Sequence, residues 1–414
     1  MEPNLDPREG AYVARQPILD ASGQVFGYEL LYRAAADAVS CQDPRDLAAA
    51  RVLNDAVLTL GLETLTGGRK AFMNVTRHML LNELVTVMAP ETIVVEVLED
   101  VGVDEEIIAA CRQLKERGYS LALDDFTLQT GAAALLPFAR YVKVDVLATP
   151  ADERRQIEKS IPKGVKLVAE KVESAQVFDE ARGLGYGLFQ GYYFCRPTTF
   201  AGGALSARRL AYARLLAALN RPNVSVNSVE DLIKHDASLT YRVLRCINSA
   251  AFGIRREIQS IRQALVLLGL EQVRKWASVW ALAGLNGGAS SEIVTIAILR
   301  ARSCEIVAAE AIGQDHASEF FLLGLCSLLD AMLGQPMATA VAELPLSDTV
   351  RGALLGEQNR ARSVLDAVIA HERGEWDEAA RIAATLPVKA ERLPAAYADS
   401  LKWARELTQV AKAA

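Results

Sequence analysis

The sequence predicts an α/β domain followed by an all-α domain: a (β/α)8 barrel of the TIM type in residues 1–200 and a helical domain in residues 201–414. The first part alternates short apolar runs with segments of helical periodicity, which is typical of a mostly parallel sheet. From about residue 204 the pattern changes to one helix after another. Polar residues also stand in or at the end of most apolar runs of the first part.

Eight apolar runs in the first part are predicted strands. The turn signal Asp-Ala-Ser-Gly joins the first two, which therefore predict a hairpin. Eight strands fit a closed barrel. An open doubly wound sheet remains the alternative, because roughly 190 residues is short for a barrel, which typically has about 250. The runs are 12–19, 24–33, 70–76, 92–99, 120–126, 141–146, 166–173 and 186–194.

Helical segments separate the later strands, most clearly at 43–65, 104–118 and 174–185. Each begins beside a residue that can accept a hydrogen bond from the first turn, namely Asp43, Asp104 and Ser174. Gly118 and Gly185 stand where helices commonly end in a left-handed glycine. These signals predict crossover helices between parallel strands.

The second part begins at the flexible Ala-Gly-Gly of 201–203 and continues as helices to the end. Trp276 and Trp280 lie one helical turn apart, which favours packing in the core over anchoring of a partner helix. His235-Asp236 matches the histidine-aspartate dipeptide of a metal-binding motif, but Asp236 is better explained as the cap of a following turn. Four histidines in the whole chain are too few and too scattered for a histidine metal cluster.

Composition excludes several classes of protein. The chain has 414 residues, of which 51% are apolar and 23% charged, as in ordinary globular proteins. Residues 1–200 carry 21 Lys and Arg against 29 Asp and Glu, and residues 201–414 carry 24 against 22. The net charge of −6 argues against nucleic acid as the main partner, because phosphate binding needs a clustered basic surface.

The cysteines and the first residues indicate a cytoplasmic protein. Six cysteines lie far apart with no Cys-x-x-Cys pair, so neither a zinc site nor a disulfide framework is expected. The sequence begins with a polar, acidic stretch that does not resemble a signal peptide. No run of about 18 uncharged apolar residues predicts a membrane span.

Polar residues in or at the ends of the predicted strands point to a site. Burying one carboxylate unpaired costs several kcal/mol, so a set of them suggests a common purpose. Catalytic residues of α/β barrels come from the carboxyl ends of several strands, and carboxylate and amide oxygens suit Mg²⁺ or Mn²⁺. The set comprises Glu29, Asn74, Glu96, Asp124, Asp125, Lys143, Glu170 and Gln190.

These residue types fit phosphodiester hydrolysis. Two such ions about 4 Å apart can activate a water and stabilise both the attacking and the leaving oxygen. The adjacent pair Asp124-Asp125 could supply a bridging carboxylate. Lys143 and Asp145 share one face of their strand, so Lys143 could point inward and balance the carboxylates. Glu170 is the candidate base.

With these motifs, the first part resembles an EAL domain, the family that hydrolyses the bacterial messenger cyclic di-GMP to its linear dinucleotide. The similarity runs in family order over residues 12–197. It comprises GYELLYR, FMNV, VEVLED, LALDDF, VKVD, AEKVE and FQGYYFCRP.

The resemblance implies a role for each matching residue. Glu29, Asn74, Glu96, Asp124 and Asp125 would bind two divalent ions, Mg²⁺ or Mn²⁺. Lys143 and Glu170 would position and deprotonate the attacking water. Arg33 would hold a substrate phosphate with its guanidinium, and Gln190 would line the same site. Glu99 and Glu173 match acidic positions that steady a mobile loop.

Three positions depart from the family pattern. The signature reads Glu29-Leu30-Leu31 in place of Glu-Ala-Leu, which need not affect the ligand. Phe126 is followed by TLQTG where the family has glycine directly after the phenylalanine, and that loop normally helps to arrange both the metal site and a homodimer. Lys171 replaces a customary glycine beside the presumed base.

The second part resembles the HDOD domain, a relative of HD phosphohydrolases that lacks their catalytic metal ligands. The similarity runs from VEDLIKHDASLTYRVLRCINSAAFG to FFLLGLCSLLDAMLG. Where HD enzymes have their dipeptide, this chain has Ser327 and Asp330 without a histidine. The order of the two domains resembles a known family of bacterial signalling proteins, which implies a regulatory helical half that binds a protein partner.

Three functions therefore stay open. The first is a metal-dependent cyclic di-GMP phosphodiesterase that the helical half regulates or targets. The second is a catalytically weak or inactive EAL domain that acts as a cyclic di-GMP receptor or a protein-interaction module, which the altered loop favours. The third is a scaffold whose carboxylates form structural ion pairs, and the retention of every ligand argues against it.

Overall fold

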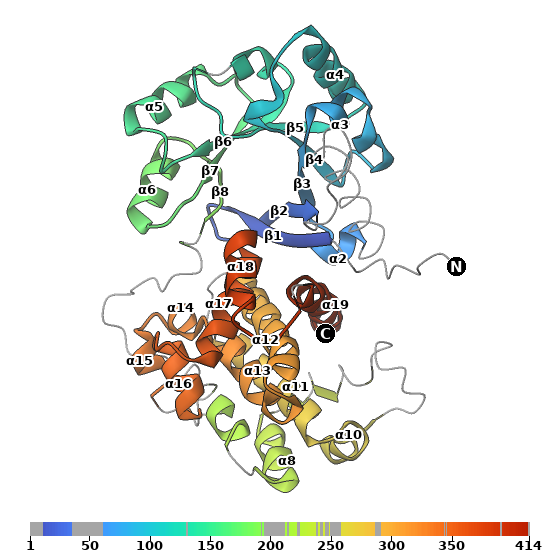
Figure 1. Cartoon of the computed structure of the whole chain (residues 1–414), viewed down its shortest axis with the longest axis vertical. Coiled ribbons are helices and arrows are strands. Elements are labelled where there is room, and N and C mark those ends of the chain that lie inside the picture. Colours follow the sequence, from blue (N-terminus) through green and yellow to red (C-terminus); the bar gives the residue numbers. More distant parts are fainter. Residues whose placement is uncertain are drawn as a thin grey trace. The chain divides into compact units, whose positions relative to one another are not determined.

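The chain forms two compact units in the computed structural model (Figure 1). One comprises Met1–Phe194 with Glu372–Trp376, and the other comprises Cys195–His371 with Asp377–Ala414. The structure describes residues 11–34, 61–129, 131–191, 193, 212, 215–221, 224–236, 239–240, 243–244, 248, 258–285, 291–342, 344, 346–389 and 391–412.

The first unit contains a closed barrel of eight strands in sequence order. Strand β1 pairs antiparallel with both β2 and β8, whereas the neighbours from β2 to β8 pair in parallel. The closed barrel and the hairpin are confirmed, and the open sheet is excluded. The strands are β1 Ala11–Asp20, β2 Val25–Ala34, β3 Lys70–Val75, β4 Ile93–Val97, β5 Ser120–Leu123, β6 Ala139–Asp145, β7 Lys166–Glu170 and β8 Leu188–Phe189.

Several strands are shorter than their apolar runs. The run 120–126 stops pairing at Leu123, because Asp125 adopts a left-handed φ of 40° and the chain turns back. Phe126 then donates its backbone N–H to the carbonyl of Lys143 at 2.9 Å and is buried by this turn. The run 166–173 ends at Glu170 for the same reason, since Lys171 has a φ of 55°.

Helices lie outside the strands, as Figure 1 shows. They are α2 Leu62–Thr66, α3 Arg77–Leu81, α4 Glu105–Glu116, α5 Ala151–Ser160 and α6 Ala175–Gly183. The predicted caps are confirmed: Asp104 accepts from the N–H of Ile107 at 3.0 Å, and Ser174 accepts from Val177 at 3.3 Å. Gly118 and Gly185 have positive φ angles. Asp43 lies outside the described residues.

One apolar layer fills the barrel and supports the polar residues. Because successive side chains on a strand point to opposite faces, a residue two positions earlier shares the inward face. Phe72 stands two before Asn74 in this way, and Val94 stands two before Glu96. From β3 to β8, each strand or the residue directly after it therefore places a polar residue above an apolar one. The buried layer consists of Ile18, Phe72, Val94, Ala122, Tyr141, Val168 and Leu188.

The second unit is helical, as predicted. Trp276 and Trp280 are buried, which confirms their place in the core. Asp236 accepts the N–H of Leu239 at 2.9 Å, which confirms it as a cap. The helices are α8 Val226–Lys234, α10 Ile261–Leu268, α11 Leu270–Leu285, α12 Ser291–Ala311, α13 Ala317–Cys326, α14 Leu329–Leu333, α15 Met337–Ala340, α16 Asp348–Leu354, α17 Arg360–Glu372, α18 Trp376–Ala383 and α19 Arg392–Lys412.

Within the described ranges, none of the helices combines the length and apolar character that crossing a membrane requires.

Candidate active site

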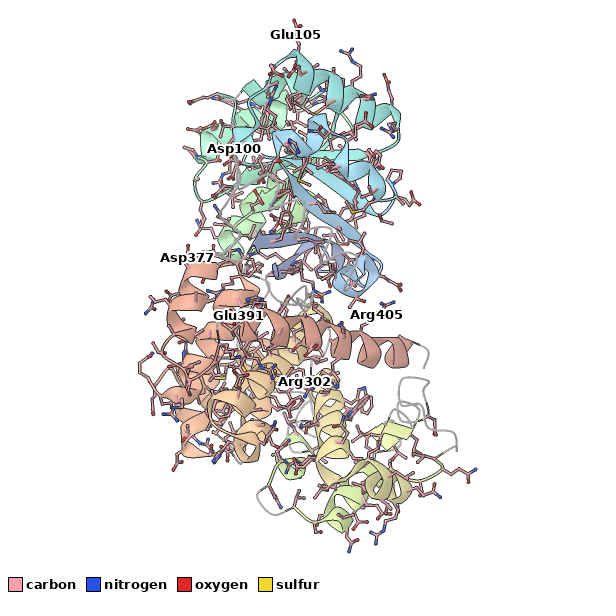
Figure 2. All side chains as sticks on the ribbon, turned by 45° about the vertical axis from the view of Figure 1, so that its right-hand side comes forward. Asp100, Glu105, Arg302, Asp377, Glu391 and Arg405 are labelled. Carbon is pink, nitrogen blue, oxygen red and sulfur yellow. The ribbon has the colours of Figure 1, made fainter. Side chains whose placement is uncertain are left out.

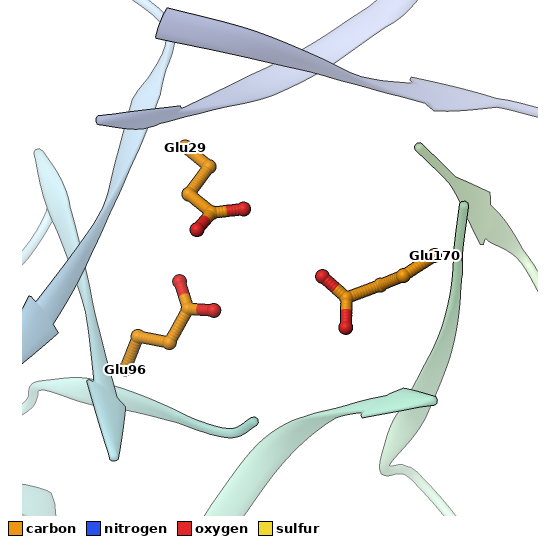
Figure 3. Close-up of side chains that lie close together, drawn as sticks. All are labelled: Glu29, Glu96 and Glu170. Atoms are coloured by element: carbon orange, nitrogen blue, oxygen red, sulfur yellow. The ribbon is translucent and has the colours of Figure 1, made fainter. Parts of the chain in front are cut away.

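The candidate site is a cluster of buried carboxylates at the carboxyl ends of the parallel strands. Glu29, Glu96 and Glu170 come from β2, β4 and β7, and their side chains converge inside the barrel (Figure 3). One carboxylate oxygen from each lies within 4.8 Å of the others. By contrast, Asp100 and Glu105 are exposed on the outside of the unit, where water solvates them (Figure 2).

Lys143 occupies the centre of this cluster. Its ammonium nitrogen lies 3.1 Å from Glu29 Oε2, 3.0 Å from Asp124 Oδ1 and 2.8 Å from Glu170 Oε1, and it also pairs with Glu96 Oε1. Only 1% of the lysine side chain is exposed. The prediction that Lys143 points inward, toward the carboxylates, is confirmed.

One lysine does not neutralise four carboxylates, and the pKa values reflect this. Burial raises the pKa of Glu170 to about 8, although Lys143 opposes the shift. Burial also raises the pKa of Glu96 well above its ordinary value. Burial alone would lower the pKa of Lys143, but Glu29, Glu96 and the other carboxylates raise it well above its ordinary value. Glu96 and Glu170 therefore favour the protonated form unless further cations offset the charge of the ionised groups.

Several acceptor oxygens of the cluster receive no hydrogen bond from the part of the chain that the structure describes. Asn74 donates its amide to Glu29 Oε1 at 3.2 Å, and Gln190 donates to Glu29 Oε2 and to Gln16 Oε1 at 2.8 Å each. Among the described residues, nothing donates to the buried atoms Asn74 Oδ1, Glu96 Oε2 and Gln190 Oε1. Because a buried acceptor without a partner is costly, these oxygens fit ligands of a hard cation.

Asp125 lies beside this cluster, beyond the end of β5. Its carboxyl is partly buried, and burial together with the charge of Asp124 raises its pKa. The charge of Lys171 lowers the pKa of Asp125, and the charge of Glu99 raises it. The structure thus brings Asp125 to the rim of the site and places Asp124 in contact with Lys143.

Two of the remaining predicted residues, Glu99 and Glu173, lie further out. Both side chains are exposed, and the negative charge of Glu99 raises the pKa of Asp125. Arg33 belongs to β2, but its side chain lies outside the described residues. The structure thus gathers seven predicted residues: Glu29, Asn74, Glu96, Asp124, Lys143, Glu170 and Gln190.

Sequence reasoning missed two neighbours of the site, and it named a third, Lys171, without its partner. Lys171 donates to Asp145 Oδ2 at 2.5 Å. Gln16 on the antiparallel strand β1 accepts from Gln190. Tyr32 donates its hydroxyl to the backbone carbonyl of Asn74 and so fixes the end of β3. Neither Gln16 nor Tyr32 had a distinguishing sequence signal.

Gly191 keeps the chain after β8 close to the loop after β7. Its φ is 149°, and a Cβ added there would lie 2.3 Å from the carbonyl oxygen of Val172. Gly191→Ala is therefore expected to lower the free energy of unfolding by about 1–3 kcal/mol, because the loop must shift away. Gly187→Ala, which meets no atom within 4 Å, is the matched control and should stay within about 0.5 kcal/mol in urea unfolding. Equal free energies of unfolding for Gly191→Ala and Gly187→Ala would show that Gly191 does not lie this close to Val172.

Comparison with known proteins identifies two family domains and full-length relatives. Residues 8–197 match the EAL domain and residues 209–344 match the HDOD domain. The chain is 34% identical over 405 residues to the uncharacterized protein YuxH of Bacillus subtilis, with 96% of this chain and 98% of YuxH covered. It is 30% identical over 413 residues to CdgJ of Vibrio cholerae, a protein named cyclic di-GMP phosphodiesterase, with 99% and 96% covered.

Solved structures show similarity to a part of the chain. The calcium and cyclic di-GMP complex of Klebsiella pneumoniae BlrP1 is 21% identical with a TM-score of 0.38, over 46% of this chain and 57% of BlrP1. An EAL-domain protein of Listeria monocytogenes is 21% identical with a TM-score of 0.36, over 44% of this chain and 87% of that protein. The two full-length relatives and the order of the two matched domains together place this chain in the family of proteins in which an EAL domain precedes an HDOD domain.

Proposed function

We propose that the chain is a metal-dependent phosphodiesterase that hydrolyses cyclic di-GMP to its linear dinucleotide. The observation that carries the proposal is the ring of four carboxylates around the buried Lys143, together with acceptor oxygens that receive no hydrogen bond from any described residue. The similarity to CdgJ over 99% of the chain supports the same substrate. The EAL-like barrel would span residues 1–200 and the regulatory helical domain residues 201–414.

The donor set fits two divalent ions, Mg²⁺ or Mn²⁺. Glu29, Asn74, Glu96, Asp124 and Asp125 would hold them, because these residues offer hard oxygen donors at one end of the barrel. When bound, the ions would supply Lewis-acid activation of a water and charge stabilisation at the reacting phosphate. Their positive charge would also offset the carboxylates that Lys143 leaves unbalanced.

The chain's own residues would carry the proton and hold the substrate. Glu170 would accept a proton from the attacking water, and Lys143 would keep its carboxylate in place through the 2.8 Å contact. Gln190 would orient Glu29 by its hydrogen bond. Arg33 would bind a phosphate of the substrate in two hydrogen bonds, as guanidinium groups do.

A receptor without catalysis is the second candidate, and Lys171 favours it. The positive charge of Lys171 interacts with the carboxylate of Asp125. The resembled family has a neutral glycine at the position of Lys171. In either case the helical half would bind a protein partner that regulates or targets the barrel, and the barrel could form a homodimer.

The proposal is tested by incubation of the full chain with cyclic di-GMP and Mn²⁺, with the linear dinucleotide measured by chromatography. We expect product from the natural protein and none from Asp124→Asn, which removes a charged ligand but keeps the side-chain shape. If the natural protein binds cyclic di-GMP without forming product, the receptor replaces the enzyme. If it neither binds nor hydrolyses the nucleotide, both candidates fail.

Arg33→Ala is expected to weaken cyclic di-GMP binding at least about tenfold, since a charged hydrogen bond to phosphate contributes roughly 1.5–3 kcal/mol. Binding is measured by calorimetry with Ca²⁺ in place of Mn²⁺. The melting temperature should not change. An unchanged dissociation constant would remove Arg33 from the phosphate site.

A further inference from the structure

A short segment from far along the chain belongs to the barrel unit. Glu372–Trp376 groups with the residues of the barrel, whereas the residues on both sides of it belong to the second unit. Helix α17 ends at Glu372 and α18 begins at Trp376, so the segment is the turn between these two helices. This α17–α18 turn gives the helical domain a covalent route into the barrel unit.

The α17–α18 turn contacts the two strands of the β1–β2 hairpin. Gln16 on β1 donates its side-chain amide to the backbone carbonyl of Arg373 at 3.0 Å. Gly374 has a left-handed φ of 74°, and a Cβ added there would lie 2.6 Å from Leu31 Cδ1 on β2. Gln16 pairs in register with Glu29, and Leu31 follows Glu29 by two residues, so these three side chains share one face of the hairpin. The turn therefore packs on the face from which Glu29 extends.

Hydrogen bonds connect this turn to the carboxylate of Glu29. Gln190 donates through one amide nitrogen to Gln16 Oε1 and to Glu29 Oε2, at 2.8 Å each. Two side-chain amides, those of Gln16 and Gln190, thus link the Arg373 carbonyl to a carboxylate of the proposed metal site. This chain of hydrogen bonds is the amide relay.

The acceptors at both ends give the amide relay one direction. A backbone carbonyl and a carboxylate can only accept hydrogen bonds, whereas each amide has an oxygen that accepts and a nitrogen that donates. If the Gln16 amide were turned over, its oxygen would face the Arg373 carbonyl and its nitrogen would face the donating nitrogen of Gln190. The Arg373 carbonyl therefore fixes the Gln16 amide, and Gln16 in turn fixes the amide that holds Glu29 Oε2.

We propose that the α17–α18 turn is a positioning element for Glu29 and that it acts through the amide relay. The inference rests on the proposed metal site. Groups that hydrogen-bond to a metal ligand orient it, and their loss lowers metal affinity. A displacement of the turn would release Gln16, leave Gln190 and Glu29 less ordered, and so weaken divalent-ion binding. Because the turn continues into α17 and α18, the helical domain can change the metal affinity of the barrel without contributing a ligand.

Variants at the turn and in the amide relay test this coupling. Gly374→Ala adds the Cβ that meets Leu31 and changes no residue of the site. Gly68→Ala is the matched control, because Gly68 has a φ of 80° in the same unit and its added Cβ meets no atom within 4 Å. Leu31→Ala combined with Gly374→Ala removes the obstructing methyl group. Gln16→Leu removes the relay but keeps the residues of the turn.

Mn²⁺ binding to the full chain without nucleotide is measured by titration calorimetry, on variants that circular dichroism shows to be folded. We expect Gln16→Leu to weaken the binding about tenfold and Gly374→Ala to weaken it at least about threefold. Gly68→Ala should stay within about twofold of the natural protein. The double variant should match Leu31→Ala within about twofold, because the turn can then return to its place.

Hydrogen exchange of the natural protein gives a second readout that needs no variant. Coupling between two sites is reciprocal, so Mn²⁺ that orders Glu29 must also order the turn. We expect Mn²⁺ to slow amide exchange in the peptide that contains Arg373 and Gly374 at least about threefold, and to leave the exchange of α5 unchanged.

These measurements separate this inference from the metal site on which it rests. If Gly374→Ala binds Mn²⁺ like the natural protein, or if Leu31→Ala does not relieve its defect, the inference is wrong and the metal site stands. Exchange in the turn that does not respond to bound Mn²⁺ leads to the same conclusion. If the natural protein binds no Mn²⁺, the proposed metal site itself fails, and this inference fails with it.

Discussion

Glu170→Gln is expected to lower kcat for cyclic di-GMP hydrolysis about 10²–10⁴-fold, the usual contribution of a positioned general base. The amide keeps the size of the side chain and can still accept the hydrogen bond of Lys143, but it cannot take a proton at neutral pH. The dissociation constant for cyclic di-GMP with Ca²⁺ should therefore stay within about threefold. Both quantities are measured on the full chain, by chromatography and calorimetry.

The matched control for this variant is Glu158→Gln on the exposed face of α5, which makes the same chemical change away from the site. It should behave as the natural protein in both measurements. If Glu170→Gln retained kcat within about threefold, Glu170 would not be the base, and another group would have to accept the proton.

Lys143→Met has the second large effect, on stability. In the presence of EDTA it should lower the free energy of unfolding of the barrel by about 3–5 kcal/mol, because removal of one partner leaves buried charges uncompensated. Here the lysine is the shared partner of Glu29, Glu96, Asp124 and Glu170. The measurement is urea unfolding followed by circular dichroism.

An exposed lysine provides the control for this substitution. Lys159→Met at the end of α5 should change the free energy of unfolding by less than about 0.5 kcal/mol. A loss below about 1 kcal/mol in Lys143→Met would contradict the account, because the carboxylates would then be neutralised without the lysine.

Much of the site could be predicted because a strand has a period of two residues. Phe72 and Asn74 on β3, like Val168 and Glu170 on β7, share the inward face of one strand. An apolar residue followed two positions later by a polar one therefore marks both the barrel interior and its carboxyl end. The same rule predicted that Lys143 points inward.

The sequence predicted less where the outcome depends on contacts between strands. The pairing of Lys171 with Asp145 depends on the register of β6 against β7 and on a left-handed backbone at a lysine, which no local preference favours. Gln16 joins the site because β1 closes the barrel against β8. The run 186–194 predicted a long strand, but among its described residues only Leu188–Phe189 belong to β8, and Gly191 lies close to the backbone of Val172.

The central claim is that the carboxylate cluster binds divalent ions and that cyclic di-GMP binds beside these ions. The most direct test is anomalous diffraction at the manganese edge from crystals of Glu170→Gln grown with cyclic di-GMP and Mn²⁺, in which turnover is blocked. The account predicts manganese peaks bonded to oxygens of Glu29, Asn74, Glu96, Asp124 and Asp125, with a phosphate of the nucleotide beside them. Bound cyclic di-GMP without manganese at these oxygens, or manganese only elsewhere on the protein, would contradict it.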